Sequence, residues 1–379
     1  MKIYLVGGAV RDSLMGLKPK DLDYVVVDSS IKEMLSLGYE KVGIDFPVFL
    51  HPKTKDEYAL ARIERSIGNR YEDFITETNN VSLNEDLIRR DLTINAIAFK
   101  DGLYYDPFNG MNDLKNKILR HTSNAFKEDP VRILRIARFL ARYPDFNVAK
   151  ETKKLIIEMI NNNMINSLVP KRIWKELSRA LTEKKPSKFF KFLNEVGFFT
   201  KNLKILNQTK KNWNNLDNNN NNLLYLQFNL LINGISNDDL LKLNKNLGSI
   251  DKDIMKLGNL YSNNIYDNLK NFNNLNNIEL INLYKLLNRN KYMIDKIYNI
   301  TKFLYKNKKI IEKKELLSFL EKLTITTVPK FILKYQKINN INPTNKEIQN
   351  YIYKKQLNFL KNKNFKLKEV KNENINFFN

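Results

Sequence analysis

The chain has 379 residues, enough for more than one domain, and a net charge of +23 at pH 7 that predicts a polyanionic partner. It contains no cysteine, which excludes disulfides, thiolate catalysis and thiolate metal sites. The sequence shows neither a signal peptide nor an apolar run of about 18 residues or more, so we expect no membrane span and a cytoplasmic location.

The first predicted element is a strand that ends at a glycine pair. Lys2–Val6 is apolar and rich in strand-forming residues, and Gly7 and Gly8 follow it directly. Glycine lets backbone amides approach an anion without a Cβ in between, and Arg11 could then clamp a triphosphate. A glycine pair standing alone is more commonly a plain turn, so the phosphate role depends on the residues that follow.

A second predicted strand, residues 20–27, carries two aspartates near its start. Asp21 and Asp23 are two positions apart, so on a strand their side chains point to one face. Adjacent carboxylates repel each other and need either solvent or a cation, and Mg²⁺ binds one or two carboxylates together with substrate phosphates. A solvated loop pair is the alternative. The adjoining apolar strand and the upstream glycine turn favour the metal site.

The next segments are less specific. Residues 57–64 are predicted to form a third strand, which makes Glu57 and Glu64 candidates for a third carboxylate without a choice between them. Residues 65–80 are polar and lack clear periodicity, as expected of a loop. Residues 86–99, which include Arg90 and Asn95, follow an amphipathic helical pattern.

A helix is predicted to start at Asp129, with the aspartate as N-cap and Pro130 in the first turn. At about 100° per residue, four arginines fall on one stripe of this helix and the apolar residues fall on the other side. These arginines are Arg132, Arg135, Arg138 and Arg142. An arginine stripe is often only a solvated helix face. Phe139 lies on the arginine side and indicates that this face contacts another group.

Asp129 and Arg132 together could recognise a nucleotide base. An ionised aspartate accepts hydrogen bonds and an arginine donates them, so the pair complements an edge with an amino donor beside a ring-nitrogen acceptor. Cytosine and adenine present that edge. Guanine and uracil would place acceptor against acceptor and leave buried groups unpaired, which discriminates strongly. A role for Asp129 as a helix cap is compatible with this one.

Four motifs, in order along the chain, carry a resemblance to a known family. They are GGAVRD at 7–12 with DLD at 21–23, RRDLTINA at 89–96, DPFNG at 106–110 with DL at 113–114, and EDPVR at 128–132. This set resembles the class II tRNA nucleotidyltransferases, the CCA-adding enzymes of the polymerase β superfamily, and is most similar to their long-chain bacterial type. The resemblance covers about the first 200 residues, and four ordered motifs are far more specific than a lone glycine motif.

The resemblance implies an α+β fold in three parts. A polymerase β-like nucleotidyltransferase head, with a mixed sheet and helices, would span residues 1–120, followed by an all-α neck with the nucleotide-selecting helix at 121–205 and a basic helical body and tail that binds tRNA at 206–379. The implied activity is template-independent addition of C, C and A to tRNA 3′ ends from CTP and ATP, with Mg²⁺ as cofactor.

The resemblance also implies roles for individual residues. Asp21 and Asp23 would be the catalytic, metal-binding pair. A further seven residues would bind the nucleotide, namely Gly8, Arg11, Arg90, Asp129, Arg132, Arg135 and Arg138. Residues 65–80 fit the loop with which the family switches from CTP to ATP, although an ordinary surface loop would look the same.

The positive charge is concentrated in the second half of the chain. Residues 1–200 carry 33 basic and 27 acidic side chains, whereas residues 201–379 carry 31 and 14. This predicts an arm laid along an RNA backbone, where phosphate contacts supply affinity without reading sequence. The same half is rich in Asn, Lys and Ile, so mutational drift in an A+T-rich genome would also produce part of the charge.

The remaining segments are predicted to be largely helical. Neck helices are expected between residues 171 and 199 with their aromatic side chains in the core, and further helices at 223–232 and 347–359, whereas residues 201–222 are predicted to be a linker or loop and the tail beyond Lys361 to fray. The two histidines, His51 and His121, lie in the first third of the chain. We therefore expect no histidine-based phosphohydrolase site of the kind that long-chain relatives often append.

Two alternatives of other classes stay open. The first is a poly(A) polymerase, a sister family with the same head, which usually has a basic Gly-Arg-Arg-Phe-like element where this chain has residues 42–48. The second is a decayed, non-catalytic RNA-binding protein, and the four intact motifs argue against it.

Overall fold

The computed structural model describes residues 1–42, 48–66, 74–218, 223–248, 250–260, 264–306, 308–324 and 328–362. The chain folds into two compact units, one of residues 1–227 and 241–250 and the other of residues 228–240 and 251–379. Within the described ranges, no helix combines the length and the apolar character needed to cross a membrane. The three-part division expected from the sequence stays a prediction.

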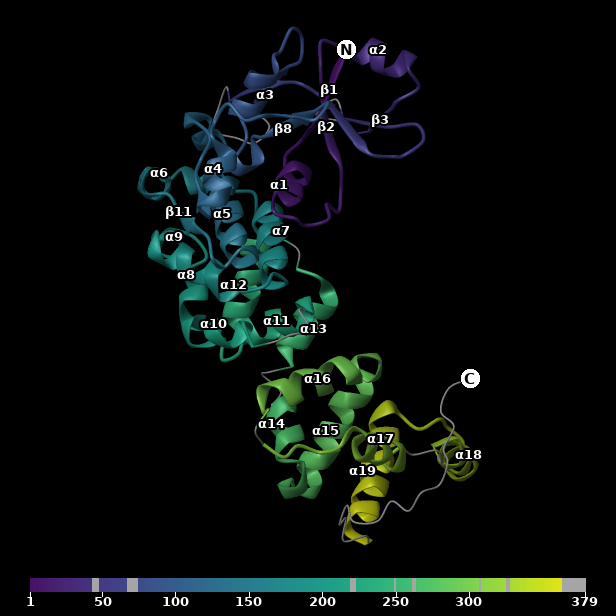
Figure 1. Ribbon diagram of the computed structural model, residues 1–379. Helices are drawn as coiled ribbons and strands as arrows, with labels where there is room; N and C mark the ends of the chain where they lie inside the picture. The colour runs from purple at the N-terminus through teal and green to yellow at the C-terminus, as the bar shows by residue number, and fades with distance from the viewer. Residues whose placement is uncertain are drawn as a thin grey trace. The chain divides into compact units, whose positions relative to one another are not determined.

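The first unit begins with a seven-stranded mixed sheet in the order β3-β4-β5-β2-β1-β8-β9. The strands are β1 (Lys2–Val6), β2 (Asp23–Val27), β3 (Glu40–Val42), β4 (Val48–Leu50), β5 (Glu57–Leu60), β8 (Ala98–Lys100) and β9 (Leu103–Tyr105). Strand β2 runs parallel to β5 and antiparallel to β1, which pairs antiparallel with β8 on its other side (Figure 1). The predicted mixed sheet is confirmed.

Both faces of the central strands are covered, which explains their nearly continuous apolar sequence. Val25 and Val27 of β2 join one buried cluster, together with Leu87 and other apolar side chains. Val26 points to the opposite face and packs in a second cluster with Phe49. The polar residues at the start of β2 therefore emerge at the end of a firmly held strand.

Helices surround and follow this sheet in the first unit (Figure 1). They are α1 (Gly8–Leu14), α2 (Ile31–Ser36), α3 (Leu83–Ile88), α4 (Gly110–Lys115), α5 (Val131–Arg142), α6 (Lys150–Asn161), α7 (Pro170–Leu181), α8 (Ser187–Glu195), α9 (Phe198–Lys201) and α10 (Lys210–Leu216). Two further helices, α11 (Leu224–Leu231) and α12 (Asn237–Leu247), each contain residues of both units. The helix predicted from Asp129 is confirmed as α5, and the neck helices as α7 and α8. The α8 residues Phe189 and Phe190 are buried, as expected of core aromatics.

The prediction of one helix across residues 86–99 is wrong. A capping box formed by Ser82 and Glu85 starts α3 earlier, and this helix ends at Ile88. The short 3₁₀ helix η1 (Thr93–Asn95) follows, and Ala98 then enters strand β8 beside β1. Apolar residues that fit a helical period here serve a strand, because pairing with β1 overrides the local pattern.

Two predicted loops also contain regular structure. Within residues 65–80, strands β6 (Ile63–Ser66) and β7 (Phe74–Glu77) pair antiparallel, whereas residues 67–73 lie outside the described ranges. Within 201–222, the 3₁₀ helix η4 (Lys204–Thr209) leads into α10, and the buried Trp213 stacks against Phe190. The asparagines around this tryptophan obscure the helical period in the sequence. Residues 219–222 are not described.

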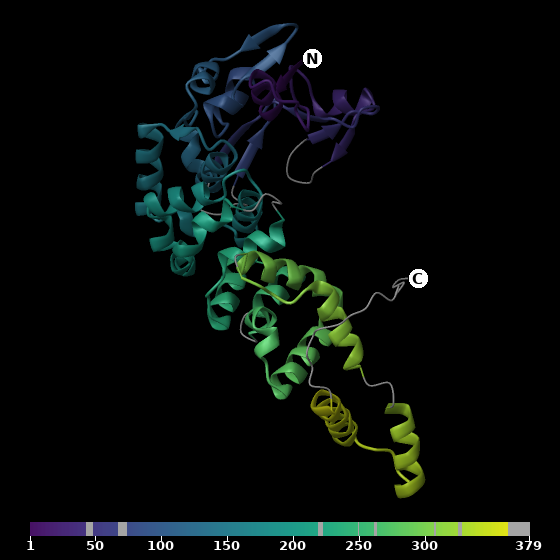
Figure 2. The ribbon, with the colours of Figure 1, turned by 60° about the horizontal axis from the view of Figure 1, so that its bottom comes forward.

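In the second unit, every regular element that the structure describes is a helix (Figure 2). The α-helices that belong wholly to it are α13 (Lys252–Asn259), α14 (Ile265–Lys270), α15 (Asn277–Arg289), α16 (Ile294–Leu304), α17 (Lys313–Lys322), α18 (Val328–Asn339) and α19 (Asn345–Asn362). Tyr266 and Phe319 are among its fully buried side chains. The helices predicted at 223–232 and 347–359 correspond to α11 and α19, and the tail beyond residue 362 lies outside the description.

The small parallel pair β10 (Ile118–Leu119) and β11 (Asn147–Val148) in the first unit is the one strand pair found beyond β9 among the described residues.

Helix α4 starts in very close contact with the η1 turn. Asp106 caps it by accepting hydrogen bonds from the backbone amides of Gly110 at 2.6 Å and Met111 at 2.8 Å. A Cβ on Gly110 would lie 2.2 Å from the carbonyl oxygen of Thr93, which belongs to the backbone of η1. The DPFNG motif therefore fixes where η1 sits, and through it the position of Asn95.

Replacing Gly110 by alanine is expected to destabilise the protein, because the added methyl group must push two backbone segments apart. Overpacking of this kind costs about 1–3 kcal/mol, a fall in Tm that thermal unfolding will detect. The matched control is Lys115→Ala, an exposed position on the same helix that should change stability by no more than about 0.5 kcal/mol. Equal Tm values for the two variants would show that α4 does not hold η1 in place.

Candidate active site

The glycine turn between β1 and α1 is overlaid by two arginines. Gly7 has a φ of +67°, a conformation that favours glycine, and its carbonyl accepts a hydrogen bond from the amide of Arg11 at 3.1 Å. A Cβ on Gly7 would lie 3.0 Å from a terminal nitrogen of Arg90, and one on Gly8 would lie 3.5 Å from a terminal nitrogen of Arg11. The residues expected to bind a triphosphate thus lie together.

Asp21 and Asp23 lie at the start of β2, both exposed to solvent. The strand begins at Asp23, three residues later than predicted, and Asp21 lies in the bend before it, so the strand periodicity that placed both side chains on one face does not apply to Asp21. Partial desolvation raises the pKa of Asp23, the guanidinium of Arg90 lowers it and the charge of Asp21 raises it, with a net rise. Asp21 and Arg90 are therefore both close enough to act on Asp23.

This carboxylate pair fits a divalent cation that also binds phosphate. A cation would relieve the repulsion between Asp21 and Asp23. Glu57 is the partner of Asp23 in the parallel β2–β5 register and so faces the same side of the sheet. Across the described residues, no three His, Asp or Glu side chains stand close enough together to hold a metal by themselves. Two carboxylates completed by substrate phosphates are the arrangement that Mg²⁺ commonly adopts. The side chain of Glu64 lies outside the description.

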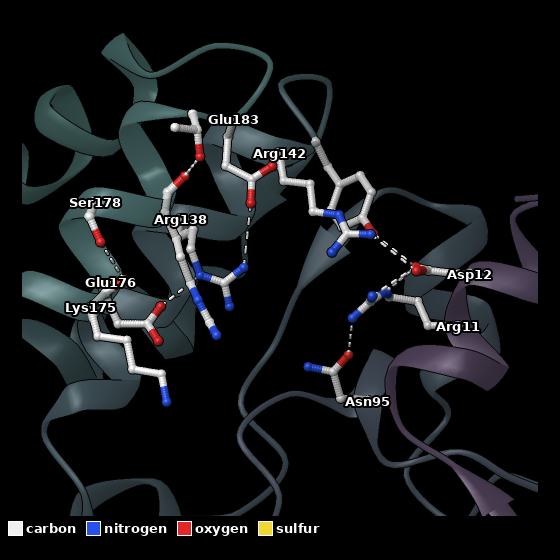
Figure 3. A network of polar contacts seen from close by, with 12 residues as sticks. Arg11, Asp12, Asn95, Arg138, Arg142, Lys175, Glu176, Ser178 and Glu183 are labelled. Atoms are coloured by element: carbon white, nitrogen blue, oxygen red, sulfur yellow. Dashed lines mark hydrogen bonds and ion pairs between the residues drawn. The ribbon is translucent and has the colours of Figure 1, made fainter. Parts of the chain in front are cut away.

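Arg11 is buried, with 4% of its surface exposed, and is held from two sides. Its Nε and one terminal nitrogen donate to Asp12 at 2.9 and 2.7 Å, and the other terminal nitrogen donates to Asn95 at 2.6 Å. Arg142 donates to the second oxygen of Asp12 at 3.0 Å and the hydroxyl of Tyr143 donates to the first, also at 3.0 Å. Figure 3 shows Arg11 and Arg142 converging on Asp12, which joins α1 to the end of α5.

Besides Arg142, two further arginines of the predicted stripe on α5 are paired with carboxylates elsewhere in the chain. The Nε of Arg135 donates to Asp91 at 2.7 Å. The Nε of Arg138 donates to Glu176 on α7 at 2.6 Å, as Figure 3 shows. A terminal nitrogen of Arg138 also lies 3.5 Å from Glu183. Burial alone raises the pKa of Asp91, but the charge of Arg135 and its hydrogen bonds hold that pKa well below the usual value. Arg135 and Arg138 are therefore held in fixed orientations.

Phe139 fills the space among these guanidinium groups. Its buried ring lies 5.2 Å from the guanidinium carbon of Arg11, 6.0 Å from that of Arg135 and 4.9 Å from that of Arg138. Cations over an aromatic face at such distances are attracted by its quadrupole. The arginine face of this helix therefore contacts other parts of the first unit, and its contact with a nucleotide stays a prediction.

Asp129 and Arg132 lie at the start of α5, in different surroundings. One oxygen of Asp129 accepts from the amide of Val131 at 3.2 Å, so the aspartate caps the first turn, although Pro130 rather than Asp129 directly precedes the helix. Both of its oxygens also accept from the guanidinium of Arg172 on α7, at 2.9 and 2.7 Å. A terminal nitrogen of Arg132 donates to the carbonyl of Ala125 at 2.8 Å. Each carboxylate oxygen has two acceptor positions, so Asp129 can still accept from a base.

Sequence reasoning missed the carboxylates that hold the arginines. Asp12, Asp86, Asp91 and Glu176 are all buried, and each accepts from one of the predicted nucleotide-binding arginines. Asp86 precedes Arg90 by four residues, a spacing at which opposite charges attract on a helix, and this pattern could have been noticed. The pairs that join distant elements leave no pattern in a single sequence.

Residues 3–120 match the family described as Poly A polymerase head domain, and residues 145–209 match one described as "Probable RNA and SrmB- binding site of polymerase A". A multifunctional CCA protein from Janthinobacterium sp. (strain Marseille) is 56% identical over 199 residues, which are 52% of this chain and 48% of that protein. A CCA-adding enzyme from Coxiella burnetii is 53% identical over 199 residues, or 52% of this chain and 53% of that enzyme. In its N-terminal half the chain is therefore similar to CCA-adding enzymes. The chain spans about half the length of these relatives.

Solved structures of CCA-adding enzymes share the fold over more of the chain. The Bacillus stearothermophilus CCA-adding enzyme in complex with CTP matches with a TM-score of 0.65 and 18% identity over 94% of this chain and 89% of that one. An apo form of a CCA-adding enzyme matches with a TM-score of 0.62 and 22% identity over 98% and 89%. The matched head family is polymerase β-like, and such nucleotidyltransferases generally use a divalent metal.

Proposed function

We propose that this protein adds C, C and A to the 3′ ends of tRNA from CTP and ATP, with Mg²⁺ as cofactor. The observation that carries the proposal is the position of Arg90, which reaches the Gly7 turn at one end of its guanidinium and acts on Asp23. A triphosphate at the turn would therefore have its α-phosphate near the carboxylate pair. Relatives of the N-terminal half named for CCA addition support the same activity.

In the proposed reaction, the 3′ hydroxyl of the tRNA attacks the α-phosphate of the nucleotide. A bond forms between the hydroxyl oxygen and the α-phosphorus, the bond to the β-phosphate breaks, the hydroxyl proton is released and pyrophosphate leaves. Mg²⁺ bound by Asp21 and Asp23 would activate the hydroxyl and stabilise the leaving pyrophosphate. Gly8, Arg11, Arg90, Arg135 and Arg138 would hold the nucleotide so that its α-phosphate faces the hydroxyl.

Asp129 and Arg132 would select the base in this proposal. The carboxylate accepts from the exocyclic amine of cytosine or adenine, and the guanidinium donates to the neighbouring ring nitrogen. The basic half of the chain would contact the tRNA backbone, because residues 201–379 carry 31 basic against 14 acidic side chains. A tRNA substrate agrees with the cytoplasmic location expected from the sequence, which stays a prediction.

Poly(A) polymerase is the second candidate, because the matched head family bears that description. The sequence difference held against it falls at residues 42–48, of which 43–47 lie outside the described ranges. A product-length assay separates the candidates. The substrate is tRNA lacking its last three nucleotides, supplied with CTP, ATP or both.

We expect two added nucleotides with CTP alone and three with both nucleotides, because each base is chosen by the protein and the product stops at the mature end. A long ladder with ATP alone would instead identify a poly(A) polymerase. Failure to extend the tRNA under any condition, by protein that still binds it, would identify a non-catalytic RNA-binding protein.

A further inference from the structure

Asp86 is a carboxylate with no exposed surface, on helix α3 at the border of the candidate site. A charge removed from water is costly unless oppositely charged hydrogen-bond donors surround it. Asp86 has such donors on both oxygens. Burial alone raises its pKa, but the charges of Arg90 and Arg89 and their hydrogen bonds lower the pKa below the usual value, so the group is ionised.

The two oxygens of Asp86 are divided between the two arginines that follow it. Oδ1 accepts from Nε of Arg89 at 3.1 Å, from a terminal nitrogen of Arg89 at 2.5 Å and from the backbone amide of Arg62 at 3.4 Å. Oδ2 accepts from Nε of Arg90 at 3.3 Å and from a terminal nitrogen of Arg90 at 3.0 Å. The carboxylate of Asp86 thus accepts hydrogen bonds from the same edge of both guanidinium groups, the edge formed by Nε and one terminal nitrogen.

Arg89 and Arg90 differ in the other contacts that their guanidinium groups make. Arg89 also donates from Nε to the backbone carbonyl of Arg62 at 2.9 Å, which ties α3 to the chain just after β5. The remaining terminal nitrogen of Arg90 instead lies 3.0 Å from the position a Cβ on Gly7 would take. Arg89 serves the packing of the head, whereas Arg90 faces the turn.

We propose that Asp86 is a positioning residue that aims Arg90 at the glycine turn, so that its outer terminal nitrogen meets the triphosphate of the incoming nucleotide. This inference rests on the proposed function, in which Arg90 binds that triphosphate. A guanidinium is planar. Hydrogen bonds to Nε and one terminal nitrogen therefore fix the direction in which the other terminal nitrogen points. A lysine offers a single rotatable ammonium with no such edge and cannot be aimed in this way.

A double-mutant cycle tests whether Asp86 acts through Arg90. The variants are Asp86→Asn, Arg90→Gln and the double variant, measured as KM and kcat for CTP and ATP on tRNA lacking its 3′ end. We expect Arg90→Gln to raise KM on the order of tenfold to a hundredfold, as for a lost hydrogen bond to a charged group. Asp86→Asn should raise KM by several-fold, and the double variant should match Arg90→Gln alone.

Arg89→Gln is the matched control, because it removes the other partner of the same carboxylate. It should lower Tm and leave KM unchanged. If Asp86→Asn does not fold, Arg90→Lys replaces it, since it keeps the charge and loses the edge that Asp86 grips. We expect its KM to approach that of Arg90→Gln, and a KM equal to that of the unaltered protein would overturn the proposal.

The outcomes separate this inference from the proposed function. If Asp86→Asn and Arg90→Gln multiply in the double variant, Asp86 is purely structural and the inference is wrong, while CCA addition stands. If Arg90→Gln leaves KM unchanged, both the inference and the assignment of Arg90 to the triphosphate are wrong. The product-length assay would still decide the activity.

Discussion

Replacing Asp23 by asparagine is expected to abolish nucleotide incorporation while tRNA binding is retained. The substitution keeps the shape of the side chain and removes the charge on which a metal ligand depends. Metal assistance contributes several kcal/mol to reactions of this class, and about 4 kcal/mol corresponds to about a thousandfold loss in rate. Asp21→Asn should behave in the same way. Single-turnover incorporation and filter binding of tRNA measure the two properties separately.

Asp28 provides the control for this prediction. It follows the same strand at its other end, where it pairs with Lys2 at 3.0 Å on the surface. Asp28→Asn should leave incorporation unchanged, which would show that loss of any aspartate charge on β2 is not sufficient. An Asp21 or Asp23 variant that works within tenfold of the unaltered protein would remove both residues from the proposed metal site.

Replacing Asp129 by alanine is expected to admit UTP or GTP, because the acceptor that repels their carbonyl groups is lost. Arg132→Ala should instead weaken CTP and ATP alike, by on the order of tenfold to a hundredfold in incorporation efficiency, since one hydrogen bond from a charged group disappears. Incorporation of each of the four nucleotides, measured one at a time, gives the selectivity of each variant.

The ion pair between Asp129 and Arg172 supplies a control for this second prediction. Arg172→Ala breaks the same pair and leaves the carboxylate in place, so it should keep the rejection of UTP and GTP. Asp129→Ala also removes a helix cap worth about 1 kcal/mol, so Tm must be measured for both variants. A folded Asp129→Ala protein that still rejects UTP and GTP would refute base selection by this residue.

The predictable part of the structure is the part fixed by local chemistry. Strand β1, the glycine turn and helix α5 follow from apolar runs, glycine and the Asp129–Pro130 pair. Residues 86–99 were mispredicted because pairing of β8 with β1 outweighs a local helical pattern. The burial of Trp213 among aromatic side chains likewise depends on contacts with α8 that an asparagine-rich segment does not reveal.

The same division holds for the candidate site. Side chains that would touch the substrate lie in short motifs and could be named from the sequence. The carboxylates that orient them could not, because Asp91 and Glu176 are paired with arginines 44 and 38 residues away. A buried charge requires a partner, but only the folded chain identifies which one.

These long-range pairs have a consequence for the order in which the chain can fold during synthesis. Asp12 is synthesised 130 residues before its partner Arg142, and Asp91 is synthesised before its partner Arg135. Asp12 also accepts from Arg11 beside it, and Asp91 from Asn95, so without α5 each carboxylate would be buried with only part of its hydrogen bonds, at a cost in free energy. We therefore expect packing around α1 and η1 to be completed only once the helix with the four arginines has been made.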